Sequence, residues 1–119
     1  MNDTKFAITN YAGCTVSCSK SQWDSHIVYE HAIMEDNCEA VKDTLKAPDS
    51  VYQSSQNASR EIYFKASSLS TYKLKTKVIV EYSPGKKDPT TIVGEVVTAF
   101  PQKEEKGGIG DVVYKRTSD

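Results

Sequence analysis

The spacing of apolar residues changes at Pro48, and this change limits the fold more than any other feature of the sequence. Before Pro48 the spacing runs in steps of four, three and four, which places on one helical face Met34, Cys38, Val41 and Leu45. Proline pushes the residue before it out of the α region, so this helix is expected to stop there. After Pro48 the apolar residues alternate with a period of two, as in strands.

Two helices are expected before Pro48. The better one lies within residues 35–49, where Asp36 followed by Glu39 resembles a capping box. A shorter helix is expected over part of residues 20–31.

Residues 72–82 form the clearest predicted strand. Its apolar face is expected to consist of Tyr72, Leu74, Thr76, Val78, Val80 and Tyr82. The opposite face carries Lys73, Lys75, Lys77 and Glu81. One face is therefore predicted to be buried and the other exposed to solvent. Residues 5–18 are expected to form a hairpin or two irregular strands, and further strands are expected at residues 50–54, 61–65, 91–100 and 112–115.

Helices followed by strands predict an α+β fold, with N-terminal helices packed on one face of an antiparallel sheet of about four to six strands. The chain has 119 residues, 38% hydrophobic and 26% charged, which fits a single globular domain over residues 1–119. Three cysteines give no disulfide framework and favour a reducing compartment. The sequence has no run of about 18 apolar residues and no secretory signal pattern, so we expect a cytoplasmic protein without membrane contact.

The net charge of −1 conceals two segments of opposite sign. Residues 24–49 hold seven acidic residues and two lysines, whereas residues 60–87 hold seven basic residues and two glutamates. A locally basic segment can bind phosphates, and it can equally be the solvated side of a strand. The acidic segment can in turn be a surface for a protein partner.

The order Cys14, Cys18, His26, His31 superficially resembles a zinc site. Only seven residues separate Cys18 from His26, where a zinc finger uses about twelve. We therefore predict no metal and no other cofactor, with the cysteines packed as small apolar residues.

The two histidines are five residues apart, which separates them by about 140° on an ideal helix. We expect His26 to be buried beside Trp23 and Ile27, where it packs and forms hydrogen bonds. His31 is expected to emerge where the first helix ends.

No motif for a serine or cysteine nucleophile is present, and no phosphate-binding glycine loop. What remains is a scattered set of polar residues: His31, Arg60, Tyr63, Lys65 and Thr98. Metal-free RNA cleavage uses these types, because it needs a base for the 2′-hydroxyl, cations for the phosphorane and an acid for the leaving 5′-oxygen.

Residues 12–100 resemble the phage-type members of the barnase, EndoU, colicin and RelE-like (BECR) nuclease group. The matching pieces are "WDSHIVYEHAIM" at 23–34, "VKDTLKAPDSVYQS" at 41–54, "REIYFK" at 60–65, "LKTKVIVEY" at 74–82 and "GEVVTAF" at 94–100. The resemblance implies a helical histidine at His31, strand positions at Arg60 with Tyr63 or Lys65, and a hydroxyl at Thr98. His26 is retained as the alternative catalytic histidine.

The resemblance leads us to expect a metal-independent ribonuclease or a toxin-like RNA-cleaving domain. RNA, including tRNA, would be its partner, bound in part by Lys73, Lys75 and Lys77. The alternative is a non-enzymatic module of the same fold that binds RNA, an inhibitor or another protein.

Overall fold

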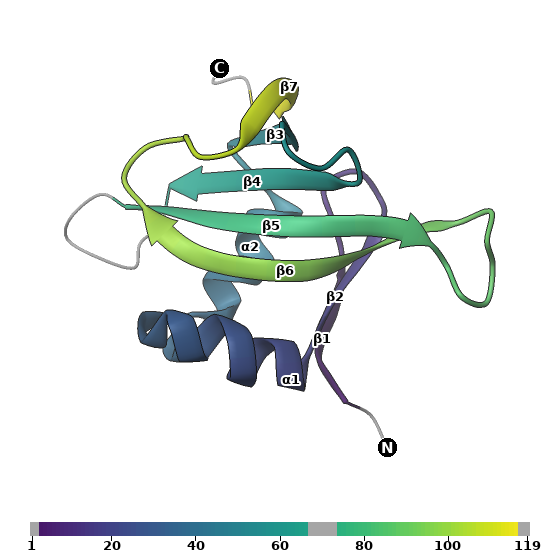
Figure 1. The fold of residues 1–119 in the computed structure, drawn as a ribbon, viewed down its shortest axis with the longest axis horizontal. Helices are drawn as coiled ribbons and strands as arrows, with labels where there is room; N and C mark the ends of the chain where they lie inside the picture. The colour runs from purple at the N-terminus through teal and green to yellow at the C-terminus, as the bar shows by residue number, and fades with distance from the viewer. Residues whose placement is uncertain (1–2, 67–73, 117–119) are drawn as a thin grey trace.

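A computed structural model describes residues 3–66 and 74–116, which form one seven-stranded sheet with short helices on one side (Figure 1). The strand order is β1-β2-β6-β5-β4-β3-β7. The strands are β1 Thr4–Thr9, β2 Thr15–Ser19, β3 Ser50–Ser54, β4 Arg60–Ala66, β5 Lys75–Pro84, β6 Ile92–Gln102 and β7 Ile109–Lys115. The α+β class is confirmed.

The sheet is wider than predicted, and it is mixed rather than antiparallel. β2 pairs with β6 in parallel, with Val16 opposite Gly94, while every other neighbouring pair of described strands is antiparallel. The prediction of four to six antiparallel strands is therefore wrong. The hairpin of β1 and β2 adds to one side of the β6-β5-β4-β3 core, and β7 adds to the other.

The strand positions themselves follow the period-two pattern. The predicted N-terminal hairpin, the strand at residues 50–54 and the long hairpin of β5 and β6 are all present. Tyr72 and Lys73, which belong to the predicted central strand, lie outside the described residues.

Within the described residues the helical part consists of four short pieces: α1 Lys20–Gln22, the π-helical η1 Trp23–Val28, the 3-10 helix η2 Ala32–Asp36, and α2 Cys38–Lys46. Ser19 caps α1, because its hydroxyl accepts a bond of 3.0 Å from the backbone amide of Gln22. The predicted capping box is wrong, since Asp36 lies in η2 and α2 begins at Cys38 without a side-chain cap. The helix ends at Lys46, before Pro48 as expected.

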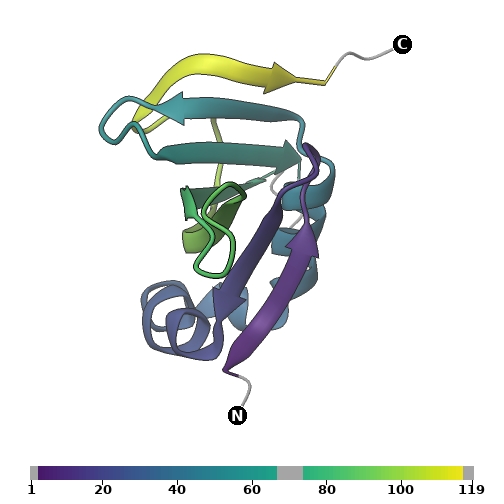
Figure 2. The same cartoon turned by 90° about the vertical axis from the view of Figure 1, so that its right-hand side faces the viewer.

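The face of the sheet toward the helices, which we call the inner face, carries the main core. Val41 and Leu45 of α2 are fully buried there as predicted, but Cys38 is only partly buried, and Met34, which is also buried, belongs to η2 rather than to this helix. They pack with Trp23 and Ile27 against strand residues that include Val51, Tyr63, Val78, Val80, Val96 and Ala99. Figure 2 shows α2 beside the β1–β2 hairpin, where the backbone amide of Tyr11 donates to the Leu45 carbonyl.

The opposite face, which we call the outer face, carries a smaller cluster of Tyr52, Ile62 and Phe64 with Ile79 and Ile109. No helix in the described residues covers it. The segment between β6 and β7 does so instead, and this segment shapes the candidate site.

Candidate active site on the outer face

Arg60 and Thr98 project from the same side of the sheet. On β4, Arg60 alternates with the outer-face residues Ile62 and Phe64. On β6, Thr98 lies opposite Ile79, which belongs to the outer cluster. The structure therefore brings two of the predicted site residues, 38 positions apart in sequence, onto one face.

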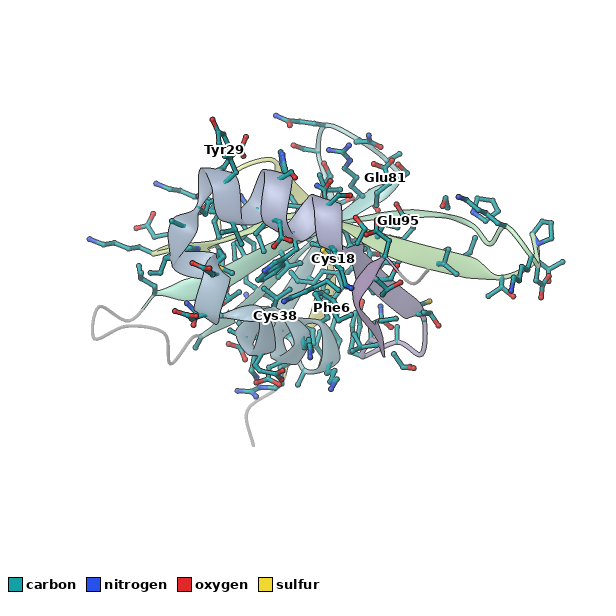
Figure 3. All side chains as sticks on the ribbon, turned by 90° about the horizontal axis from the view of Figure 1, so that it is seen from below. Phe6, Cys18, Tyr29, Cys38, Glu81 and Glu95 are labelled. Carbon is teal, nitrogen blue, oxygen red and sulfur yellow. The ribbon has the colours of Figure 1, made fainter. Side chains whose placement is uncertain are left out.

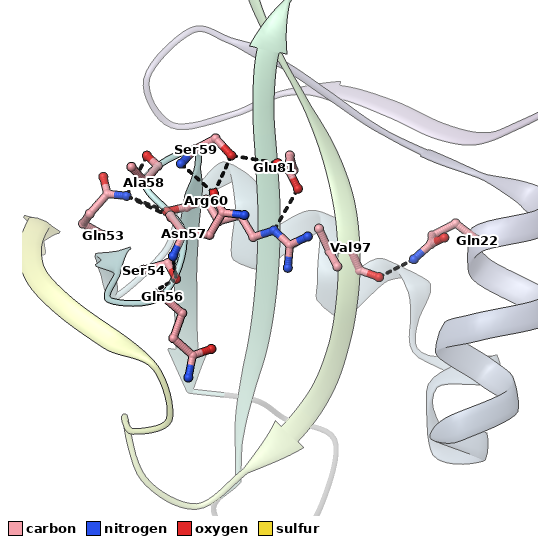
Figure 4. Close-up of polar contacts among 10 residues, drawn as sticks. All are labelled: Gln22, Gln53, Ser54, Gln56, Asn57, Ala58, Ser59, Arg60, Glu81 and Val97. Atoms are coloured by element: carbon pink, nitrogen blue, oxygen red, sulfur yellow. Dashed lines mark hydrogen bonds and ion pairs between the residues drawn. The ribbon is translucent and has the colours of Figure 1, made fainter.

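Arg60 is held in place by an ion pair across the strands. Its Nε donates to Oε2 of Glu81 at 2.8 Å, and the hydroxyl of Ser59 donates to the other carboxylate oxygen at 2.7 Å (Figure 4). Both bonds lower the pKa of Glu81, and the bond from Ser59 has the larger effect. Because Glu81 engages Nε, the terminal nitrogens of the guanidinium lie outside this pair.

A cleft of about 340 Å³ lies beside Arg60 on the outer face. Among its lining residues the two charged ones, Arg60 and Lys77, are both cations. The full lining is Ser54, Gln56, Asn57, Arg60, Ile62, Lys77, Ile79, Gly107 and Gly108. A cleft with two cations and polar side chains is suited to an anionic group.

Lys77 is 4% exposed, so the prediction that it faces solvent is wrong. Its ammonium donates to the carbonyls of Lys106 at 2.9 Å and Gly107 at 3.1 Å, and lies over the rings of Phe64 and Phe100. Burial lowers its pKa. The chain reaches this position through Gly107 and Gly108, whose φ angles of 91° and 70° favour glycine.

Lys75 is also engaged within the protein. Its Nζ lies 2.5 Å from Oε2 of Glu105. The other carboxylate oxygen of Glu105 accepts hydrogen bonds from the hydroxyls of Ser50 and Tyr52. Burial would raise the pKa of Glu105, but the three hydrogen bonds outweigh it and lower the pKa to about 2. Lys73 lies outside the described residues. RNA binding by the three lysines stays a prediction, and two of them have protein partners.

His31 reaches the edge of the same face. Its ring stacks on Phe100, with centroids 4.8 Å apart and planes inclined by 26°. Phe100 lies two residues after Thr98 and opposite Lys77 on β5, so the imidazole is close to the outer face.

The hydroxyl of Thr98 is buried and has no hydrogen-bond partner in the part of the chain that the structure describes. Buried hydroxyls are normally paired, so an unpaired one at this position needs an explanation. The hydroxyl of Thr76, which points to the inner face, is likewise buried without a partner among the described residues.

His26 is not enclosed as the sequence suggested. Trp23 and Ile27 are buried, but the His26 side chain is 42% exposed and its Nε2 lies 3.8 Å from a carboxylate oxygen of Glu30. Nearby on the same helix, the amide of Gln22 donates to the carbonyl of Val97, which fastens the helix along β6 (Figure 4). His26 thus belongs to the helix that borders β6 next to Thr98.

Tyr63 and Lys65 do not join this group, because they point to the inner face. Tyr63 is fully buried, and the amide nitrogen of Asn10 donates to its hydroxyl at 2.9 Å. Lys65 donates to the carbonyl of Ala47 at 2.8 Å. The separation of three residues between Arg60 and Tyr63 already places them on opposite faces of a strand, so the sequence held this information.

Cys18 does not have the properties of a catalytic thiol. Cys18 is buried close to Cys38 and Phe6 (Figure 3), and burial raises the pKa of its thiol to about 12. A thiol with so high a pKa supplies almost no thiolate at neutral pH. Within residues 3–66 and 74–116, no three His, Cys, Asp or Glu side chains group closely enough to hold a metal ion.

Sequence reasoning missed two features of this site. Glu81, which orients Arg60, was expected only to be a solvent-facing strand residue, and Phe100, which stacks with His31, was not singled out. Both could have been found by pairing β5 with its neighbours, since Arg60 lies opposite Glu81 and Lys77 opposite Phe100.

Comparisons of this chain with protein-family models, with curated proteins and with solved structures find no match. None of the helices in the described ranges is long and apolar enough to cross a membrane.

Proposed function

We propose that this protein is a metal-independent ribonuclease that cleaves RNA at the outer face around Arg60, Thr98 and His31. The observation that carries the proposal is the position of Arg60 and Thr98 on one face of the sheet, with the imidazole of His31 stacked on Phe100 at its edge. The resemblance of the sequence to BECR nucleases supports the same residues.

In the proposed reaction the 2′-hydroxyl of RNA attacks the adjacent phosphorus and the bond to the 5′-oxygen breaks. A histidine takes the proton from the 2′-hydroxyl, and the guanidinium of Arg60 stabilises the negative charge of the phosphorane. The hydroxyl of Thr98 donates a hydrogen bond to a phosphate oxygen. The imidazolium formed in this way gives the proton to the leaving 5′-oxygen, so the products, a 2′,3′-cyclic phosphate and a 5′-hydroxyl, balance the atoms without water.

The test is incubation of the purified protein with total RNA and with tRNA in EDTA, followed by analysis of the new ends. Arg60→Gln and His31→Ala are each expected to reduce cleavage by about 100-fold, because each removes one catalytic interaction. Lys65→Gln is the matched control, since it removes a cation from the same strand on the opposite face. Unchanged cleavage by Arg60→Gln, or products without a cyclic phosphate, would reject the proposal.

Thr98→Val separates catalysis from stability. The change removes a buried hydroxyl that has no partner among the described residues, so the melting temperature should stay level or rise slightly. Cleavage should fall by about 10-fold or more if the hydroxyl contacts the phosphate. His26→Ala is the last variant of the set. If His26→Ala is inactive and His31→Ala is active, His26 and not His31 is the base.

A non-enzymatic binding module is the second candidate, and one observation favours it. Glu81 pairs with Arg60 and Glu105 pairs with Lys75, so two cations near the outer face are already neutralised within the protein. RNA that is retained by the protein but stays intact in the same assay would support this candidate.

A further inference from the structure

A second cleft lies at the end of the sheet near the turn that joins β1 and β2. It has a volume of about 470 Å³ and is mostly apolar. We call it the tyrosine groove, and it is lined by Asn10, Tyr11, Ala12, Cys14, Gln53, Ala58, Ser59, Glu61, Tyr82, Ile92 and Val113. Two of these, Ile92 and Val113, are exposed apolar side chains at 47% and 46%.

Glu61 is the charged residue in this lining. No cation among the described residues lies within ion-pair distance of its carboxylate. Burial raises its pKa, and a hydrogen bond from Tyr82 acts in the opposite direction. A half-buried carboxylate without a cation is unfavourable by itself, and a cationic ligand would compensate it.

A chain of hydrogen bonds lies beside this carboxylate. The side-chain oxygen of Asn10 accepts from the backbone amides of Ala12 and Cys14, so its amide nitrogen points to the hydroxyl of Tyr63. The hydroxyls of Tyr63 and Tyr82 are hydrogen-bonded to each other, and the amide nitrogen of Asn10 also donates to Tyr82 at 3.3 Å. Asn10 therefore donates to both tyrosine hydroxyls and holds them beside Glu61.

Tyr11 adds an aromatic wall. Its ring packs edge-on against Tyr63 at 5.7 Å and tilted against Tyr114 at 4.8 Å, so its orientation is fixed on two sides. A carboxylate beside a fixed aromatic ring binds organic cations, through an ion pair and a cation–π contact.

We propose that the tyrosine groove binds an arginine side chain of a partner polypeptide, with the guanidinium on Glu61 and Tyr11 and adjacent apolar residues of the partner on Ile92 and Val113. Charge complementarity selects this occupant over RNA, because the groove has a carboxylate and no basic lining residue. The proposal does not rest on the ribonuclease activity, since Glu61 and Arg60 point to opposite faces of β4.

The test is an NMR titration of the isotope-labelled protein with N-acetyl-arginine methylamide. Amide signals of Tyr11, Glu61 and Tyr82 should shift and saturate, with a Kd on the order of 1–10 mM for this small probe. The citrulline analogue, which has the same shape without the charge, should bind at least tenfold more weakly.

Glu61→Gln should raise the Kd for the arginine probe at least tenfold, while RNA cleavage stays at the wild-type level. Glu35→Gln is the control, because it removes an exposed carboxylate elsewhere. Ile92→Lys, which adds a cation at the rim without touching the hydrogen-bond chain, should also weaken binding. Equal affinity of the wild type and Glu61→Gln, the absence of saturable shifts, or shifts of the groove signals by a 2′-O-methyl RNA oligonucleotide would overturn the proposal.

Discussion

The inner and outer faces of the sheet both bury aromatic side chains, but different interactions cover them. Helical residues such as Trp23, Ile27 and Met34 cover the inner face with apolar contacts. A loop covers the outer face, and it is fastened by polar bonds of Glu105 and of the Lys77 ammonium. Apolar packing is non-directional and insensitive to pH, whereas the polar bonds depend on geometry and charge. The outer face is therefore the one that a single charge change can open.

The largest effect is expected on the inner face. Trp23→Ala removes a ring that is 1% exposed and should lower the free energy of unfolding by about 3–5 kcal/mol. Tyr29→Ala on the same helical segment is the control, because Tyr29 is 84% exposed and points away from the fold (Figure 3). Denaturant unfolding measures both, and similar losses for the two variants would contradict the placement of Trp23 in the core.

A smaller effect is expected on the outer face. Glu105→Ala leaves Lys75, Ser50 and Tyr52 without their shared acceptor and should cost about 1–3 kcal/mol. Glu104→Ala is the matched control, since the neighbouring Glu104 side chain is 73% exposed. Amide hydrogen exchange of residues 103–108 should increase in Glu105→Ala alone. Equal exchange in both variants would mean that Glu105 does not hold the loop.

The same bonds of Glu105 should make the stability of the protein depend on pH, and this effect should be smaller than that of Glu105→Ala. Its pKa is lowered from 4.5 to about 2 in the folded protein, so its contribution is complete above pH 4.5 and is lost as the pH falls toward 2. With solvent screening, the difference in stability between wild type and Glu105→Gln should shrink by about 1–2 kcal/mol between pH 5 and pH 2. A difference that is constant over this range would contradict the prediction.

The contribution of Glu61 to stability should change with pH in the opposite direction to that of Glu105. Its pKa is raised in the folded protein, so the folded state holds the proton more tightly, and stability falls as the pH rises through the folded pKa. Glu61→Gln should therefore stabilise the protein at pH 7 by up to about 1 kcal/mol, with the gain lost below pH 4. A destabilised variant at pH 7 would mean that the Tyr82 bond outweighs the cost of burial.

The secondary structure was predictable because it depends on local periodicity, but the sheet order was not. The buried face of α2 at Val41 and Leu45 and the alternation around Val78 both follow from spacing. The parallel pairing of β2 with β6 depends on where the helices place the chain, and no local signal records it. Spacing also shows which face a lysine takes, but not whether a distant loop covers that face, as it covers Lys77.

The candidate site was also predictable only in part, because local spacing does not record how distant segments pack together. Arg60 and Thr98 lie on one face as strand geometry requires, whereas the stacking of His31 on Phe100 depends on the helix that borders β6. The enclosure of His26 was wrongly expected because a helical pattern identifies the apolar side but not how far a neighbouring position is covered.

The parallel pairing of β2 with β6 also governs how the chain can fold while it is being synthesised. Gln22 and its partner Val97 are 75 residues apart, so at 5–20 residues per second the ribosome takes roughly 4–15 s to supply β6 after the hairpin has emerged. During that interval the hydrogen-bonding edge of β2 has no strand beside it, and such an edge is a template for pairing with other chains. Chaperone binding to the nascent hairpin would therefore protect this edge until β6 has been made.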